Sequence, residues 1–372
     1  MYRDIKKALE NWKGNCDHKP LIVVGARQVG KTYIIREFSR ENYKTTIEYN
    51  FQDDAKACAF FSSHRSAGEI ISYLELNHMD IRFDDKTLVF FDEIQLCPEL
   101  INSLKFLQSE SKCDFICSGS MLGVKLHTMS SWPVGYVELL KMYPMSFMEF
   151  VKAAGLNDHY LEELTESIKK RQEIPEALHE KLSSLFDEYM VCGGMPEAVQ
   201  SYVKYGIRDA IAINRRLCND YRMDIAHYAD GKTKIKAQEC FDSIPMQLAK
   251  ENKKFQYSAI KKGYNARYFD ESLTWLENAG LVLKTHRLSQ IFIPLSTHLE
   301  LGVFKVYMFN TGILVGQFSD NEIFDFLENA LGMYKGMLYE NIFAQIFAEK
   351  SITNYYYEPN TSSEIDFVIQ TK

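Results

Sequence analysis

A short apolar run at Leu21–Val24 leads directly into the pattern Gly-x-x-x-x-Gly-Lys-Thr at residues 25–32. The run predicts a buried strand, and the periodic apolar residues after Lys31 predict a helix. A glycine-rich loop between these elements turns backbone N–H groups and the positive end of the helix towards one point. The lysine ammonium suits phosphate oxygens, and the Thr32 hydroxyl suits Mg²⁺. The pattern therefore predicts a loop that binds the phosphates of a nucleoside triphosphate, through Gly25, Arg27, Gln28, Val29, Gly30, Lys31 and Thr32.

Two carboxylates follow a second apolar run, Thr87–Phe91. Because ligands of α/β sheets bind at the carboxyl ends of the parallel strands, we expect Asp92 and Glu93 beside the phosphate loop. Asp92 is expected to hold Mg²⁺ together with Thr32, and Glu93 to orient or deprotonate the attacking water. Ser118 ends the next expected strand. It either acts as a third catalytic residue that senses the γ-phosphate or belongs to a simple Ser-Gly-Ser turn.

Hydrolysis of a triphosphate usually requires an arginine that stabilises the charge of the transition state. The sequence does not select one arginine for this role. The absence of a clear choice leaves two hypotheses open, an ATPase that cycles between nucleotide states and an ATP-gated scaffold that hardly hydrolyses. The oligomeric state is also left open. The candidates for this role are Arg27, Arg215, Arg216 and Arg222.

The composition limits the class of protein. A chain of 372 residues predicts two or three domains, and its 46% hydrophobic and 25% charged residues are typical of globular proteins. The formal charge of −7 argues against a surface that binds nucleic acid all over. The charged N-terminus is unlike a signal peptide, and the absence of a long apolar run predicts no membrane span. Eight cysteines without a C-x-x-C spacing favour reduced thiols in a cytoplasmic protein.

The order of the expected elements predicts an α/β chain. Strands are expected at Leu21–Val24, Thr45–Asn50, Thr87–Phe91 and Asp114–Ser118. They alternate with helices over residues 1–155, which is typical of a P-loop domain with a parallel sheet covered by helices on both faces. Residues 156–230 are mostly helical, and the Gly-Gly-Met-Pro break at 193–196 predicts a turn or hinge. Residues 231–298 predict a winged-helix domain, and residues 299–372 a small α/β domain.

The third of these regions is basic. Residues 232–267 contain nine Lys or Arg and three acids, a net charge of +6 (nine minus three). The expected helices are followed by two β runs, Leu281–Leu288 and Gln290–Leu295, which predict a hairpin. A winged helix either binds double-stranded DNA, with lysines on the phosphates, or binds a protein partner. The candidate contacts to nucleic acid are Lys253, Lys254, Lys261, Lys262 and Arg267, with Tyr257 and Tyr264 beside them.

Taken in order, these motifs resemble one family over nearly the whole chain, the bacterial and archaeal ATP-binding proteins that join an AAA-type ATPase domain to a C-terminal domain of uncharacterised function. The resemblance implies ATP and Mg²⁺ at the residues given above, and a winged helix in the middle of the chain. Relatives often carry a basic residue where this chain has Tyr136. Besides the phosphate loop, the resemblance rests on the segments 91–95, 118–123, 133–136, 143–150, 193–196, 244–248, 253–255, 275–280, 340–341 and 364–367.

The same resemblance relates the C-terminal region to restriction-endonuclease-like folds. Such sites gather a helix Glu, a strand Asp and a following Glu-x-Lys around a metal ion. Glu340 and Asp366 match the first two, with Glu364 close by on the same strand face, but no Glu-x-Lys follows before Lys372. We therefore expect a vestigial site without nuclease activity. The alternative role for these carboxylates is polar contact within a small α/β domain.

Overall fold

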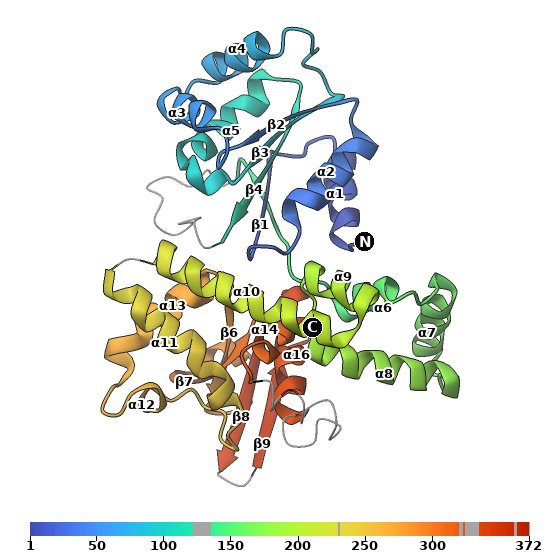
Figure 1. Cartoon of the computed structure of the whole chain (residues 1–372), viewed down its shortest axis with the longest axis vertical. Coiled ribbons are helices and arrows are strands. Elements are labelled where there is room, and N and C mark those ends of the chain that lie inside the picture. Colours follow the sequence, from blue (N-terminus) through green and yellow to red (C-terminus); the bar gives the residue numbers. More distant parts are fainter. Residues whose placement is uncertain (122–134, 230, 320–322, 324–334, 361–362, 372) are drawn as a thin grey trace. The chain divides into compact units, whose positions relative to one another are not determined.

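The structure is a computed structural model, and it describes residues 1–121, 135–229, 231–319, 323, 335–360 and 363–371. The chain forms two compact units (Figure 1). The N-terminal unit is Arg3–Tyr143, and the C-terminal unit comprises Met1–Tyr2 and Pro144–Lys372. Two segments that contributed to the family resemblance, Leu122–Gly123 and Pro133–Val134, lie outside the described residues.

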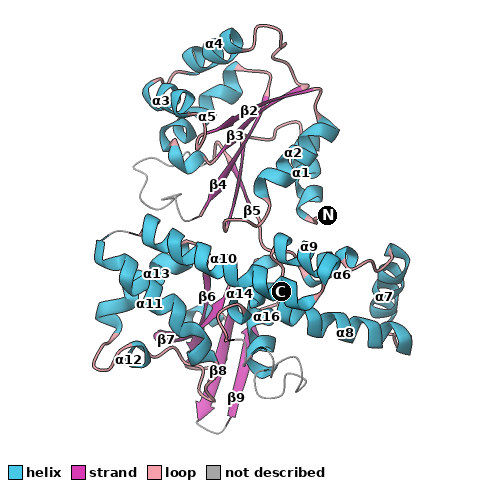
Figure 2. Ribbon diagram, viewed as in Figure 1, coloured by secondary structure: helices cyan, strands magenta, loops and turns pink. Residues whose placement is uncertain are grey.

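The N-terminal unit is built on a five-stranded parallel sheet in the order β2-β3-β4-β1-β5 (Figure 2). Successive side chains of a strand point to opposite faces of the sheet. The fully buried strands therefore contribute to a hydrophobic core on each face. Helices α3, α4 and α5 pack on the face that contains Ile22, Val89 and Phe115, while α1 and α2 cover the other (Figure 1). The strands are β1 Leu21–Gly25, β2 Thr45–Asn50, β3 Thr87–Asp92, β4 Asp114–Ser120 and β5 Glu138–Lys141, and the helices are α1 Ile5–Gly14, α2 Lys31–Asn42, α3 Ala55–Ser63, α4 Ala67–Asn77 and α5 Pro98–Glu110.

This architecture confirms the predicted P-loop fold. Four of the five strands agree closely with the predicted ones, and β5 was not predicted. Each crossover brings the carboxyl end of a strand to the same edge of the sheet, where β1 runs into the phosphate loop and β3 ends at Asp92. That edge carries the candidate site.

The C-terminal unit combines helices with a four-stranded mixed sheet in the order β7-β6-β8-β9 (Figure 2). Strand β6 pairs antiparallel with β7 and parallel with β8, and β8 pairs antiparallel with β9. The helices are α6 Phe147–Ala153, α7 Asp158–Lys170, α8 Glu176–Cys192, α9 Pro196–Tyr205, α10 Ile207–Tyr228, α11 Gly231–Leu248, α12 Tyr257–Ile260, α13 Ala266–Asn278, α14 Thr311–Val315 and α16 Lys335–Glu349, and the strands are β6 Val282–Leu288, β7 Leu299–Met308, β8 Asn354–Asn360 and β9 Ser363–Ile369.

The hairpin prediction was wrong in its second strand. The partner of β6 is β7, and the expected strand Gln290–Leu295 is mostly an irregular segment in which Phe292 and Ile293 are exposed. Pro294 lacks the N–H that a paired strand requires, and a 3₁₀ turn follows it before β7 begins. The boundary expected between residues 298 and 299 therefore falls between two paired strands of one sheet.

The Gly193-Gly194 pair lies between α8 and α9 and is closely packed. Gly193 has a φ of +67°, which favours glycine, and a Cβ on it would overlap Asn310 and Gly312. A Cβ on Gly194 would overlap the backbone of Met145, whose N–H donates to the Gly194 carbonyl at 2.6 Å. The two glycines thus allow close backbone contact at this turn.

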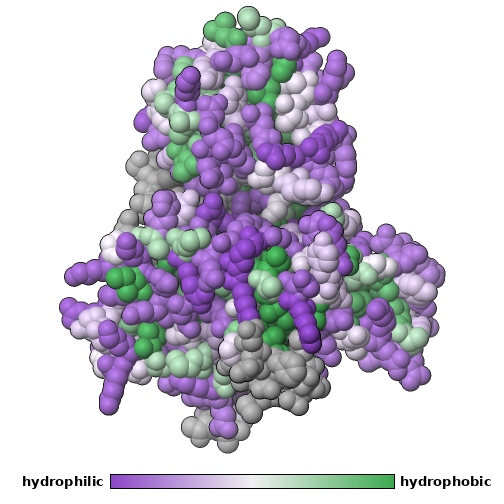
Figure 3. All heavy atoms as spheres, viewed as in Figure 1, coloured by the Kyte–Doolittle hydropathy of each residue, from purple (hydrophilic) through white to green (hydrophobic). Residues whose placement is uncertain are grey.

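The surface of each unit is mostly hydrophilic in the view of Figure 3, with hydrophobic residues in small patches. Of the helices in the described part of the chain, none is long and apolar enough to cross a membrane. All eight cysteines are free thiols, and six of them are buried.

Candidate nucleotide site

The phosphate loop joins the end of β1 to the start of α2. Gln28 and Gly30 have φ values of +62° and +97°, so the loop uses the left-handed region twice before the helix begins at Lys31. Gly25 allows close approach of the neighbouring chain, because a Cβ there would overlap the Met142 carbonyl oxygen. Gly25 and Gly30 thus supply close approach and backbone freedom, whereas Gln28 adopts the left-handed region in spite of its side chain.

The Lys31 ammonium is held inside the phosphate loop. Its Nζ donates to the carbonyl oxygens of Gly25 at 3.0 Å and Ala26 at 2.8 Å, and the residue is only 7% exposed. Burial lowers the pKa of Lys31 to about 8, although the carboxylates of Glu93 and Asp92 act in the opposite direction. The lysine is thus a poorly solvated cation beside the loop.

Asp92 brings together three of the residues predicted from the sequence. It is 2% exposed, and its Oδ2 accepts a hydrogen bond from Thr32 Oγ1 at 3.0 Å. The Ser118 hydroxyl donates to its Oδ1. The structure thus places a hydroxyl from α2, a carboxylate from β3 and a hydroxyl from β4 in direct contact. A carboxylate and an adjacent hydroxyl are oxygen ligands that suit Mg²⁺.

Glu93 follows Asp92 directly after β3 and lines the same site. Its φ of +56° is rare for a residue with a side chain, and its N–H donates to Asp92 Oδ1 at 3.1 Å. The Gln95 amide donates to the Glu93 carboxylate, and Ser120 N–H donates to Gln95 Oε1 at 3.1 Å. Backbone strain of this kind is common at functional sites.

A cavity of about 640 Å³ opens in front of the loop. Its size is in the range of small-molecule sites. Of the predicted loop residues, Arg27, Gln28, Gly30, Lys31 and Thr32 line it, together with Glu93. Further along α2, it is lined by residues that the sequence analysis did not select, Tyr33, Arg36, Glu37 and Arg40.

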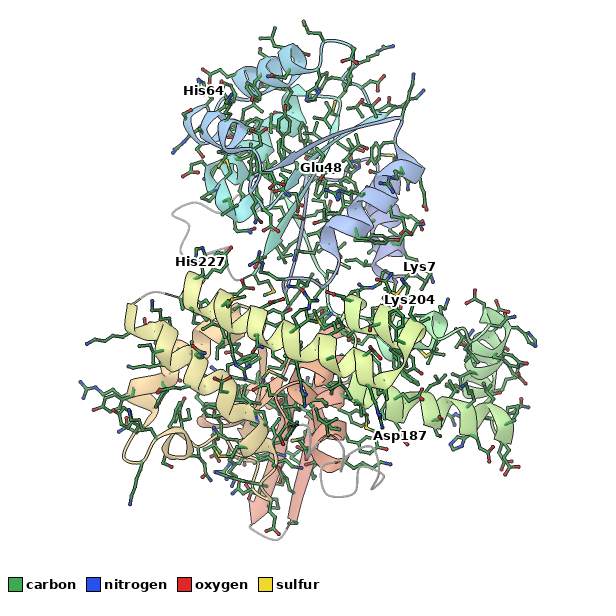
Figure 4. All side chains as sticks on the ribbon, viewed as in Figure 1. Lys7, Glu48, His64, Asp187, Lys204 and His227 are labelled. Atoms are coloured by element: carbon green, nitrogen blue, oxygen red, sulfur yellow. The ribbon has the colours of Figure 1, made fainter. Side chains whose placement is uncertain are left out.

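Two arginines that the sequence analysis did not select, Arg36 and Arg3, make defined contacts at the site. Arg36 lines the cavity and makes a two-pronged ion pair with Glu48 of β2, with its Nη2 2.6 Å from Oε1 (Glu48 is labelled in Figure 4). The guanidinium of Arg3, only 5% exposed, donates to the carbonyl oxygens of Val29 at 2.8 Å and Tyr143 at 2.7 Å. Arg3 therefore supports the phosphate loop from behind. The helical spacing of Tyr33, Arg36 and Arg40 after the motif could have indicated a shared face.

The four candidate arginines occupy different environments. Arg27 lines the cavity. The other three lie on α10 in the C-terminal unit, where Arg215 donates to the Phe318 carbonyl at 3.2 Å. Arg216 pairs with Glu197, and Arg222 Nε lies 2.8 Å from Asp242 Oδ1.

The predicted nucleic-acid residues divide into two groups. Lys253 and Lys254 point inward, because their ammonium groups pair with Glu340 and Glu358. By contrast, Lys261, Lys262 and Arg267 are exposed. Aromatic side chains accompany this second group, with Lys261 Nζ 5.0 Å from the Tyr264 ring and Lys236 Nζ 5.7 Å from the Tyr268 ring.

The three carboxylates predicted from the nuclease resemblance meet around one lysine. The buried Nζ of Lys305, on β7, lies 3.0 Å from Glu340 Oε2, 2.6 Å from Glu364 Oε1 and 3.3 Å from Asp366 Oδ1. Tyr307 OH also donates to Glu340 at 2.8 Å. An ammonium therefore occupies the centre of the carboxylate cluster. The described residues contain no group of three or more His, Cys, Asp or Glu side chains that could hold a metal ion.

Comparisons with known proteins agree with the fold of the N-terminal unit. Residues 17–151 match a family model described as an AAA domain. Over those residues the N-terminal unit is similar to AAA domains, and its parallel sheet has the P-loop fold. Residues 183–321 match a model described as a domain of unknown function (DUF8612). No curated protein matches the chain.

Several solved structures are similar to the chain over most of its length. A Walker-type ATPase of Pyrococcus abyssi is 13% identical, with a TM-score of 0.51, 85% of this chain covered and 95% of that one. The Aeropyrum pernix Orc1 protein in complex with DNA is 13% identical, with a TM-score of 0.34 and coverages of 87% and 94%. Cdc6p from Pyrobaculum aerophilum is 10% identical, with a TM-score of 0.30 and coverages of 91% and 93%. The similarity to the first supports the shared fold.

The buried ammonium of Lys305 generates a prediction about stability. Burial lowers the pKa of Lys305, but Glu340 and Glu364 outweigh burial and the net pKa is raised. Replacement by methionine leaves the carboxylates without their central cation, and we expect the free energy of unfolding to fall by about 3–5 kcal/mol. Denaturation in urea measures this loss. Lys335→Met removes a cation from an exposed pair with Asp187 (labelled in Figure 4) and is expected to cost less than about 1 kcal/mol.

The same cluster defines a pH window. Burial raises the pKa of Glu340, but Lys305 and Lys253 outweigh it, so the net pKa lies below its ordinary 4.5. Its contribution to stability is therefore present above pH 4.5 and lost as the pH falls through the lowered pKa. The Lys305 contribution is present below pH 10.5 and lost as the pH rises through its raised pKa. A Lys305→Met profile as steep as that of the wild type at both ends would contradict this assignment.

Proposed function

We propose that the chain is a Mg²⁺-dependent ATPase whose N-terminal unit binds and hydrolyses ATP. The observation that carries the proposal is the contact of Thr32 and Ser118 with Asp92 beside the cavity that Lys31 and Glu93 line. Thr32 and Asp92 would hold Mg²⁺, which would neutralise phosphate charge. The phosphates would replace the Gly25 and Ala26 carbonyl groups as partners of the Lys31 ammonium.

Glu93 is assigned as the general base. Water adds to the γ-phosphorus while the bond to the β,γ-bridging oxygen breaks, ADP leaves with that electron pair, and a water proton passes to the Glu93 carboxylate. Ser118 is assigned to the γ-phosphate end, because it contacts Asp92 from the neighbouring strand. Arg27 is the candidate for transition-state charge that lines the cavity.

The nucleotide cycle is proposed to change how the C-terminal unit engages a partner. The basic face of α11 to α13 supports double-stranded DNA as that partner, because exposed cations alternate there with tyrosines. Its exposed members are Lys261, Lys262, Arg267 and Tyr268, and the half-buried Lys236 and Tyr264 lie beside them. Lys253 and Lys254 are left out of this surface, because they are paired with carboxylates. The competing proposal for this face is a protein partner. The competing proposal for the N-terminal unit is a scaffold that binds ATP and hardly hydrolyses it.

The Glu93→Gln variant tests the ATPase proposal. It keeps the size of the side chain and removes the base, so we expect ATP binding to persist while turnover falls by roughly 10²–10⁴-fold. Lys31→Ala is expected to weaken binding, because one charge-assisted contact contributes about 1.5–3 kcal/mol. Phosphate release and titration with a fluorescent ATP analogue measure the two effects. Wild-type turnover by Glu93→Gln would overturn the base assignment, and tight ATP binding with no turnover in the wild type would favour the scaffold.

The lowered pKa of Lys31 predicts a pH dependence of ATP binding. The pKa of about 8 in the free protein should rise when phosphates surround the ammonium. The affinity should therefore be constant below pH 8 with respect to this group and fall by about tenfold per pH unit above it. Isothermal titration from pH 7 to 10 measures the slope. Lys31→Arg, whose cation does not titrate, should bind ATP without this slope.

The DNA proposal is tested by the dependence of affinity on salt. If the basic face contacts phosphates, log K should fall linearly with log salt, and removal of one contact should reduce the slope by about one. We expect Lys262→Ala to do this, whereas Lys254→Ala, which removes an inward-facing lysine, should leave the slope unchanged. Fluorescence anisotropy with duplex DNA measures both, and ATP turnover with duplex DNA, RNA or neither tests coupling. A slope near zero would favour the protein partner.

A further inference from the structure

Gln95, which the sequence analysis did not select as a site residue, connects Glu93 after β3 to Ser120 at the end of β4. Gln95 lies in a short 3₁₀ turn, Ile94–Leu96, immediately after Glu93. Its Nε2 donates to Glu93 Oε2, and its Oε1 accepts from the Ser120 N–H at 3.1 Å. One side chain therefore joins the assigned base to the end of β4.

The orientation of this amide follows from its two neighbours. A backbone N–H can only donate, so Ser120 requires the oxygen of the carboxamide. The nitrogen then faces Glu93, where an ionised carboxylate can only accept. The bridge is thus specific for a group that has an acceptor on one side and a donor on the other, and glutamine supplies both.

The turn itself does not depend on this side chain. Backbone hydrogen bonds from Leu96 N–H to the Glu93 carbonyl and from Cys97 N–H to the Ile94 carbonyl, each 3.0 Å, close it. Ile94 and Cys97 are fully buried and anchor it in the core. Gln95 itself is half-buried and does not line the cavity. Its polar contacts therefore go towards the carboxylate and β4 and leave the fold of the turn to other groups.

We propose that Gln95 is the positioning residue for Glu93 in ATP hydrolysis. Its N–H fixes the carboxylate in one orientation, and its oxygen ties that orientation to β4, the strand that also carries Ser118. Gln95 would thereby fix the position of the base relative to the γ-phosphate end of the site. The inference rests on the proposed ATPase function.

Two substitutions of Gln95 test its contacts with Glu93 and with Ser120. Gln95→Glu keeps an acceptor for Ser120 but replaces the donor to Glu93 by a like charge, and Gln95→Met removes both contacts at similar size. We expect kcat to fall by about 10–100-fold in both, since loss of an orienting partner typically costs this much. The KM for ATP should change by less than about threefold, because Gln95 is not among the residues that line the cavity.

A double-mutant cycle distinguishes positioning from a general structural role. If Gln95 acts through Glu93, then Gln95→Met should lower the single-turnover rate by less than about twofold in a Glu93→Gln background. Gln200→Glu, the same chemical change at an exposed position of α9, is the matched control and should retain wild-type turnover. Thermal unfolding midpoints and affinity for a fluorescent ATP analogue verify that each variant is folded.

The outcomes are separable from those of the proposed function. Wild-type kcat in Gln95→Glu and Gln95→Met, together with a slow Glu93→Gln variant, would overturn the role of Gln95 and leave the ATPase assignment intact. An equal loss from Gln95→Met in the wild-type and Glu93→Gln backgrounds would also overturn it, because the effect would then bypass Glu93. Wild-type turnover by Glu93→Gln would instead refute the base assignment itself.

Discussion

The structure of the N-terminal unit depends on how one buried carboxylate is satisfied. Asp92 ends a strand whose residues are all buried, and a carboxylate that leaves water requires hydrogen-bond donors. Thr32 comes from α2, Ser118 from β4, and the N–H of Glu93 from the turn that follows. These donors can meet only because the sheet order sets β3 beside β4 and β4 beside β1, so the topology and the polar centre depend on each other.

Much of this centre could be predicted from the sequence because its determinants are local. The spacing of Gly25, Gly30 and Lys31 fixes a loop conformation, and β2 has the same bounds that its residue pattern predicts. Strand β5 was missed because only four residues, none of them buried, form it, and its existence depends on pairing with β1. A short, half-exposed strand has little periodic signal of its own.

The contacts that escaped prediction span long stretches of sequence. Arg3 donates to the carbonyl oxygen of Val29, 26 residues away, and to that of Tyr143, 140 residues away. No local sequence pattern predicts partners at such separations. The exposed segment around Phe292 resembles a strand in composition, yet the pairing of β6 is completed by β7 and by β8 much further along the chain. Tertiary pairing overrides β propensity in such cases.

The C-terminal carboxylates converge on a cation that the chain itself supplies. Glu340, Glu364 and Asp366 do converge, as the nuclease resemblance implies, but the cation among them is the ammonium of Lys305. Three carboxylates at this spacing need positive charge whether it comes from a metal ion or from a side chain.

The same excess of negative charge attracts Lys253, whose ammonium pairs with Glu340. Lys253 is therefore not one of the solvent-facing cations. Lys254 is held in the same way by Glu358. Lysines that look alike in sequence thus separate into internal counterions and an exposed face. The electrostatics of the C-terminal sheet consequently decide which part of the basic region remains available to a polyanion.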